Sequence, residues 1–316
     1  MKKLFALALA LMSAAAAAQT FPSKTVRFVS GVTPGSASDT MARILADKLQ
    51  QKWGQSVIVE NRLGAGGLVG ARYVAQQAEP DGHTIMMYAS AFTVSTLLSP
   101  EVLSPKDMQA VAMVATIPTI LVTSPEKGYK KVQDLVAAAK AQPGKLVCSD
   151  AGIGSATHMN FERFRFSAGI EVVNVHTKGV SEALTEVISG RADCYFALVF
   201  QAKKMVDGGR VVALATGSPR RSSLMPDVPT TLELGYPNSD YNFWVGALVP
   251  SKTPRAIVDK LHADITALVE SAEVSDQIKK LGCDPAPMSV SDFEALIARE
   301  LAENAELIKR AKITAN

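Results

Sequence analysis

The sequence is poor in the residues that several common protein classes require. Aromatic residues make up only 6% of the 316-residue chain, and its 33 lysines and arginines nearly balance 30 aspartates and glutamates. A chain so close to neutral has no electrostatic basis for binding nucleic acid or anionic lipid. Its 47% hydrophobic residues are typical of a folded globular protein. The length is sufficient for about two domains, each with its own core.

Cysteine and histidine are also scarce. The three cysteines, Cys148, Cys194 and Cys283, form no C-x-x-C pair, and their odd number argues against a disulfide scaffold. Cys148 and Cys194 lie in apolar, strand-like segments, where we expect buried and chemically inert thiols. One helical pair, His158 with Glu162, has the spacing of metal ligands but no third ligand close by in the sequence. We therefore expect no metal site and no other cofactor.

A single long hydrophobic run occurs, and it lies at the N-terminus. Lys2 and Lys3 precede an apolar stretch over residues 4–12, and five alanines follow shortly after it. This order is typical of a secretory signal peptide, which we expect over residues 1–18 with cleavage after Ala18. The run is too short for a permanent membrane span of ~20 residues. We therefore expect an exported protein that is soluble outside the cytoplasmic membrane.

Short apolar segments alternate with helical patterns along most of the chain, which is typical of α/β folds with parallel sheets. Three of the expected strands, over residues 25–30, 145–149 and 171–175, lead into turns of small or polar residues that are followed by a helix. Ligands of open α/β sheets bind at this edge, where helix N-termini offer free N–H groups and partial positive charge. The three turns therefore predict a site for a carboxylate or a phosphate.

Catalytic motifs are weak or missing by comparison. The glycine-rich segment 64–70 imitates a dinucleotide-binding loop, but Val69 occupies the third glycine position. No phosphate loop and no G-x-S-x-G nucleophile elbow occurs. A serine hydrolase would have to combine Ser155 or Ser149 with His158, and these residues lie around one turn, without an independent carboxylate to orient the base. A secreted α/β hydrolase or esterase that acts on small carboxylic esters remains the alternative.

Several longer stretches carry a resemblance to one protein family. They are Pro34-Gly35-Ser36-Ala37-Ser38-Asp39, Val59-Glu60-Asn61-Arg62, Pro80-Asp81-Gly82-His83-Thr84, Gly152-Ile153-Gly154-Ser155 with His158, Lys178-Gly179, and Pro226-Asp227-Val228-Pro229-Thr230. In these stretches the sequence resembles Bug-type extracytoplasmic solute receptors, the binding component of tripartite tricarboxylate transporters. The resemblance implies a type II periplasmic-binding-protein fold, with two doubly wound α/β domains and a ligand cleft between them. It implies a binding protein without enzymatic activity.

The same resemblance implies the domain organisation and the partners. Residues 19–120 and 225–316 would form one domain, and residues 121–224 would form the other. The protein would be a periplasmic monomer that captures a small carboxylate and delivers it to integral-membrane transporter subunits. A dicarboxylate, aliphatic or aromatic such as terephthalate, is the preferred ligand. A role in sensing instead of transport stays open from the sequence.

The residues expected to bind the ligand lie on the turns that match the family. They are Thr33, Gly35, Ser36, Ala37, Ser38, Asp39, Ser90, Ala91, Ala151, Gly154, Ser155, Thr157, His158, Thr177, Lys178 and Asp193. The resemblance implies that backbone N–H groups and bridging waters hold the carboxylate. Two departures from the family alter the pocket wall, namely the serine and alanine residues after Gly35, and His176-Thr177 where a proline and an aromatic residue are usual. Aromatic candidates for an apolar wall are Tyr88, Phe92, Phe196 and Phe200.

Overall fold

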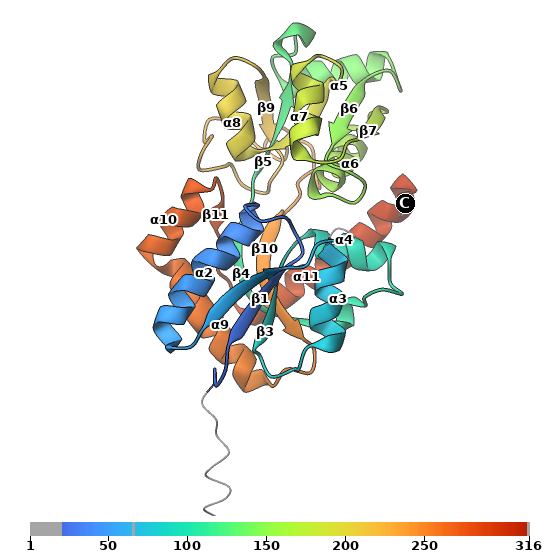
Figure 1. The fold of residues 1–316 in the computed structure, drawn as a ribbon. Helices are drawn as coiled ribbons and strands as arrows, with labels where there is room; N and C mark the ends of the chain where they lie inside the picture. Colours follow the sequence, from blue (N-terminus) through green and yellow to red (C-terminus); the bar gives the residue numbers. More distant parts are fainter. Residues whose placement is uncertain (1–20, 65–66, 315–316) are drawn as a thin grey trace, which may run out of the picture.

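The computed structural model describes residues 21–64 and 67–314, which form two α/β domains, one above the other in Figure 1. The first domain is built on a six-stranded sheet with the order β11-β4-β10-β3-β1-β2. Its strands are β1 Val26–Ser30, β2 Val57–Asn61, β3 Thr84–Ala89, β4 Met108–Thr116, β10 Trp244–Pro250 and β11 Asp284–Pro285. Strand β1 pairs in parallel with β2 and β3, whereas β10 and β11 pair antiparallel with their neighbours. The predicted signal peptide lies outside the described residues.

Helices cover both faces of this sheet because its buried strands are apolar on both sides. In β1, Val26 and Phe28 point into one core and Val29 into the other, since successive side chains of a strand alternate. The helices on one face are α2 Ala37–Trp53, α9 Arg255–Glu270 and α10 Ala272–Lys280, and those on the other are α3 Leu68–Gln77, α4 Ala91–Leu98 and α11 Val290–Ala311. The first domain is therefore doubly wound, as predicted.

The second domain repeats this arrangement on a five-stranded sheet with the order β7-β6-β8-β5-β9. Its strands are β5 Thr119–Thr123, β6 Val147–Asp150, β7 Val173–His176, β8 Cys194–Leu198 and β9 Val212–Thr216. Helices α5 Val132–Ala141 and α6 Ala156–Ala168 cover one face, and α7 Val180–Ile188 and α8 Val199–Asp207 cover the other. Strands β6, β7 and β8 are parallel, so the helices that follow them all begin at one edge of the sheet.

The chain passes between the two sheets twice, between β4 and β5 and again between β9 and β10. The predicted domain boundaries lie at residues 120/121, within strand β5, and at residues 224/225, and they stay a prediction. Helix α11 extends from the first domain to α6 of the second domain, where the C-terminal end of the chain lies (Figure 1). Across residues 21–64 and 67–314, none of the helices combines the length and the apolar character that a membrane span requires.

Cys148 and Cys194 are buried, as predicted, but they form a disulfide bond instead of two inert thiols. The two residues lie directly opposite each other on the neighbouring parallel strands β6 and β8, with 4.6 Å between their Cα atoms. The sequence places them 46 residues apart and does not show which strands are neighbours. Cys283 is a buried free thiol, and burial raises its pKa to about 12.

Candidate ligand-binding cleft

A cavity of about 620 Å³ lies between the two domains, and we call it the cleft. Helices α2 and α4 follow the neighbouring strands β1 and β3, and helices α6 and α8 follow the neighbouring strands β6 and β8. Residues in the first turn of all four helices line the cleft. Each helix N-terminus carries partial positive charge and free N–H groups. Val180, the first residue of α7, also lines the cleft, so five helix N-termini surround one cavity and favour an anionic ligand.

The side chains of the cleft are neutral. Among the described residues, no charged side chain lines it. Its polar side chains belong to Ser36, Ser38, Ser95, Ser155, Thr157 and Gln201. Its larger apolar and aromatic side chains belong to Val32, Met87, Tyr88, Val94, Leu98, Ile117, Ile153, Val180, Leu198, Phe200 and Phe243. Such a lining suits a ligand with an apolar body and a few polar atoms, whose negative charge is met by backbone groups.

The first wall of the cleft is the turn into helix α2. Ser36 is the N-cap of the helix, and its Oγ accepts a hydrogen bond from the backbone N–H of Asp39 at 3.3 Å. Gly35 precedes it with φ of 81°, a left-handed conformation that glycine adopts without strain. The backbone N–H groups of Ala37 and Ser38 have no hydrogen-bond partner among the described residues. Because both residues line the cleft, these two donors are available to a ligand.

Asp39 does not line the cleft but holds the first wall in place from behind. Its buried carboxylate accepts hydrogen bonds from the Gly35 N–H at 2.9 Å, from Asn61 at 2.7 Å and from the Arg43 guanidinium at 2.9 Å. Asn61 also donates to the Val32 carbonyl oxygen at 3.0 Å. Burial alone would raise the pKa of the Asp39 carboxyl, but the hydrogen bonds from its partners outweigh burial and lower it.

Asp39→Asn should therefore weaken both the fold and the wall. A lowered carboxyl pKa contributes stability above the usual value of 3.8, and this contribution is lost as the pH falls through the folded-state pKa. Since Arg43 is half exposed and screened by solvent, we expect a loss of about 1–2 kcal/mol at neutral pH. The melting temperatures of the variant and of the wild type should converge as the pH falls below 3.8. Asp47→Asn, at an exposed position on the same helix, is the control, and an equal loss there would contradict this role for Asp39.

The second wall, the turn into helix α6, has the same local construction as the first. Ser155 is the N-cap, its Oγ accepts from the His158 N–H at 3.2 Å, and Gly154 precedes it with φ of 72°. The N–H groups of Ala156 and Thr157 again have no partner among the described residues, and both residues line the cleft. The two walls share the sequence Gly-Ser-Ala-(Ser/Thr), at residues 35–38 and 154–157. They present matched pairs of free N–H donors from the two domains.

Residues 41–313 match the TctC family model, described as the tripartite tricarboxylate transporter family receptor. The chain belongs to this family. It is 30% identical over 307 residues to protein BugT of Bordetella pertussis. The aligned region covers 96% of this chain and 94% of that protein. The structure of R. palustris Rpa4515 with adipate is 26% identical, with a TM-score of 0.80, and covers 93% of this chain and 99% of that chain. MatC from Rhodopseudomonas palustris with bound malate is 26% identical, with a TM-score of 0.75, and covers 91% of this chain and 100% of that chain.

These matches confirm the predicted Bug-type receptor of the TctC family and its two-domain periplasmic-binding-protein fold. The predicted ligand residues that line the cleft of this receptor are Gly35, Ser36, Ala37, Ser38, Ala91, Ala151, Gly154, Ser155 and Thr157. The predicted ligand residues outside the cleft lining are Thr33, Asp39, Ser90, His158, Thr177, Lys178 and Asp193.

Behind the second wall of the receptor, His158, His176 and Asp150 bring their potential metal-ligand atoms within 4.8 Å of one another. The hydrogen bonds of these three side chains indicate a structural role, because they hold the backbone of the second wall in place. His158 Nδ1 accepts from the Gly154 N–H at 3.0 Å, so the ring is neutral, and burial together with the charges of neighbouring groups lowers its pKa to about 3. Asp150 contacts His176 Nδ1 at 2.8 Å and accepts from the Gly152 N–H at 2.8 Å. The three side chains thus fix the glycines that shape the wall.

The other predicted residues outside the cleft have partners elsewhere. Thr177 donates its hydroxyl to the Asp150 carbonyl oxygen at 2.8 Å, and the exposed Lys178 donates its backbone N–H to Glu182. Asp193 lies at the start of β8, whereas the cleft adjoins the end of that strand. Its carboxylate accepts from the Val147 N–H and pairs with Lys127, both at 2.8 Å. The structure therefore gives Asp193 a role within the second domain.

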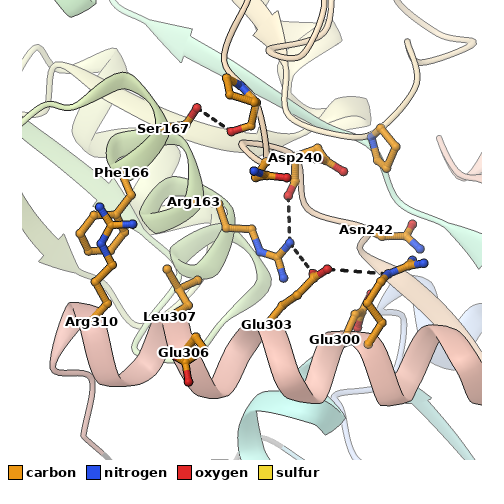
Figure 2. A pocket seen from close by; sticks show the side chains of 14 residues that line it. Arg163, Phe166, Ser167, Asp240, Asn242, Glu300, Glu303, Glu306, Leu307 and Arg310 are labelled. Atoms are coloured by element: carbon orange, nitrogen blue, oxygen red, sulfur yellow. Dashed lines mark hydrogen bonds and ion pairs between the residues drawn. The ribbon is translucent and has the colours of Figure 1, made fainter.

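A larger cavity of about 810 Å³ lies between α6 of the second domain and α11 of the first (Figure 2). Several charged side chains line it, and some of them bridge the domains: Arg163 of α6 contacts Glu303 of α11 at 3.0 Å and also donates to Asn304 of α11 at 3.1 Å. Figure 2 also shows Arg310 of α11 against the Phe166 ring of α6, 3.9 Å from the ring centroid. These groups hold the two domains together, and none of the described residues that line this cavity lies in the first turn of a helix. The smaller cavity is therefore the better ligand site.

Glu300 also lines the larger cavity, and its burial leads us to expect that the free energy of unfolding depends on pH. Its side chain is buried and accepts a hydrogen bond from Trp244 Nε1 at 2.9 Å, and burial raises its pKa from 4.5 to about 8. A raised carboxyl pKa contributes stability that is complete below pH 4.5 and is lost as the pH rises through 8. Glu300→Gln keeps the acceptor and cannot ionise, so it should match the wild type near pH 5 and exceed its stability by about 2 kcal/mol near pH 9.

Unfolding of Glu300→Gln by denaturant at both pH values measures this effect. Glu306→Gln, at an exposed position on the same helix, is the control and should leave stability unchanged. A Glu300→Gln variant whose stability parallels that of the wild type from pH 5 to pH 9 would show that Glu300 is ionised in the folded protein throughout.

Sequence reasoning missed several cleft residues of the second domain and of the segment that connects it to the first. They are Ile153, Ala156, Val180, Leu198, Gln201 and Phe243. Of the aromatic candidates, Tyr88 and Phe200 line the cleft, whereas Phe92 and Phe196 are buried in the cores. The strand around Cys194–Leu198 was expected, but it runs directly into α8 without a turn of small residues. The start of α8 reaches the cleft because β8 lies beside β6. This neighbourhood follows from the order of the strands in the sheet, which the sequence does not show.

Proposed function

We propose that this receptor captures a small carboxylate in the periplasm and delivers it to the integral-membrane subunits of a tripartite tricarboxylate-type transporter. The observation that carries the proposal is the convergence of five helix N-termini on a cleft without charged side chains among its described residues. A carboxylate fits the free N–H donors of such helix ends. Export through a signal peptide over residues 1–18 and action as a monomer belong to the same proposal.

A dicarboxylate is the ligand that these walls favour. Each domain contributes a Gly-Ser-Ala turn with two free N–H groups, so a ligand with two carboxylates can contact both domains at once. The apolar lining between the walls suits an aliphatic or aromatic body. The relatives solved with adipate and with malate support this choice, because both of those ligands are dicarboxylates.

The geometry of the turn into α6 argues against the alternative, a hydrolase with Ser155 as its nucleophile. The Ser155 hydroxyl accepts from the backbone N–H of His158 and caps α6. The His158 ring directs Nδ1 to the Gly154 N–H, so that nitrogen does not act as a base towards Ser155. A nucleophilic serine needs a base within hydrogen-bond reach of its hydroxyl. This geometry therefore favours binding over ester cleavage.

A thermal-shift screen followed by calorimetry tests the proposal. Adipate or terephthalate should raise the melting temperature of the mature protein, because a ligand of the folded state stabilises it. Each should bind below about 100 µM, roughly 5.5 kcal/mol. Hexanoate and 4-methylbenzoate, which lack one carboxylate, should bind at least about tenfold more weakly, because one set of donors stays unpaired. Failure of every dicarboxylate and monocarboxylate to bind would overturn the proposed function, and equal binding of the matched acids would overturn the preference for two carboxylates.

A further inference from the structure

Gln201 differs from the other polar side chains of the cleft. It is the only side-chain amide among the described lining residues. Its Oε1 atom is buried and has no hydrogen-bond partner in the part of the chain that the structure describes. The hydroxyls of Ser155 and Thr157, in contrast, already accept backbone N–H groups of their own wall. A buried polar atom without a partner costs free energy unless a ligand or water satisfies it.

The position of Gln201 is fixed by the fold. It lies in the first turn of α8, which begins directly after β8, and β8 is the parallel neighbour of β6. The start of α8 therefore lies beside the start of α6, and its residues face the same cleft. Unlike α2 and α6, α8 has no side-chain N-cap, because Leu198 occupies that position. Gln201 thus supplies a polar group to an otherwise apolar stretch of the lining.

The adjacent residue shows that this stretch is built to receive a ligand body. Phe200 lines the cleft, and its side chain is 38% exposed although it is a large aromatic residue. It is held from the other side by Gly282 of the first domain, where an added Cβ would come within 2.5 Å of the Phe200 Cβ. An exposed ring beside an unpartnered amide suits a ligand that has an apolar body and a polar group beyond it.

We propose that Gln201 is the specificity-determining residue of this receptor, and that its amide binds the second polar group of the ligand together with the free N–H groups of the second wall, Ala156 and Thr157. The inference rests on the proposed function. A half-turn of the side-chain amide exchanges its oxygen and nitrogen, so Gln201 presents either a donor to a carboxylate or an acceptor to a hydroxyl. For a dicarboxylate, the amide N–H₂ donates to the second carboxylate without placing a charge in the cleft.

Calorimetry with matched ligands tests this role. The ligands are adipate and hexanoate, which share a six-carbon chain and differ in one carboxylate. Gln201→Leu should weaken adipate binding at least about tenfold and change hexanoate binding less than about threefold, since only adipate loses a hydrogen bond. Gln201→Glu should weaken adipate binding further, because two carboxylates would then face each other, while it affects hexanoate less. Gln133→Leu, at an exposed position on α5, is the control and should leave both affinities unchanged.

The outcomes separate this inference from the proposed function. Equal losses for adipate and hexanoate in Gln201→Leu would show that Gln201 supports the cavity and does not recognise the second group. No loss for adipate in either variant would overturn the inference, while adipate binding to the wild type would leave the proposed function standing. Failure of the wild type to bind either acid would overturn both. Melting temperatures without ligand verify that each variant is folded.

Discussion

Ala37→Pro and Ala156→Pro are each expected to weaken carboxylate binding about 10- to 100-fold without unfolding the protein, because a hydrogen bond to a charged group contributes about 1.5–3 kcal/mol. Both residues are the first of their helices, where proline is favoured because its missing N–H has no partner within the helix. The preceding N-caps, Ser36 and Ser155, already have the extended conformation that proline requires of its neighbour. Each substitution therefore removes one donor of the cleft and leaves the helix start in place.

The matched control is Ala272→Pro, which changes the first residue of α10 after the N-cap Ser271. That helix start does not line the cleft, so carboxylate affinity should equal that of the wild type. Calorimetric titration with the tightest-binding dicarboxylate measures all three variants, and their melting temperatures verify folding. Unchanged affinity in both Ala37→Pro and Ala156→Pro would mean that other groups bind the carboxylate.

Loss of the Cys148–Cys194 disulfide is expected to destabilise the second domain by about 2–4 kcal/mol. The bond closes a long loop, since its two cysteines are separated by 46 positions in the sequence, and such a bond restricts the unfolded chain more than the folded one. The melting temperature should fall by roughly 10 °C, since each kcal/mol shifts a domain of this size by several degrees. Cys148→Ala combined with Cys194→Ala, measured by thermal unfolding, tests this expectation.

Two controls accompany the disulfide experiment. Reductant should lower the melting temperature of the wild type and have no effect on the double variant. The unfolded, unreduced protein should titrate as a single free thiol, Cys283, and as three after reduction. Three thiols before reduction, or a double variant as stable as the wild type, would contradict a stabilising disulfide.

The parts of the fold and site that depend on local sequence could be predicted. Strands that lead into helices through small-residue turns indicated both the α/β class and the walls of the cleft, because caps and turns depend on residues close in the chain. The repeated Gly-Ser-Ala-(Ser/Thr) pattern at residues 35–38 and 154–157 was also present in the sequence. It was the available signal that the two walls are built alike, with Asp39 and His158 each accepting the N–H of the glycine four residues before.

The remaining features depend on which distant segments are neighbours. The disulfide requires β6 and β8 to be adjacent, and the place of Gln201 beside the second wall requires the same pairing. Asp193 was predicted to contact the ligand, but its carboxylate accepts a hydrogen bond from the Val147 N–H. This contact lies at the start of β8, whereas the cleft lies at the end of that strand. The buried state of Glu300 likewise follows from the packing of α11 against the first domain and α6. Hydrophobic patterns do not encode sheet order, so the sequence alone left these features open.

A crystal structure of the mature protein with adipate would test the central claim most directly. The account predicts carboxylate oxygens within about 3 Å of the backbone nitrogens of Ala37 or Ser38 in one domain and of Ala156 or Thr157 in the other. It also predicts that no lysine or arginine side chain contacts the ligand. Adipate bound in the cleft through a charged side chain, or bound between α6 and α11 beside Arg163, would contradict the claim that helix N-termini hold the carboxylate.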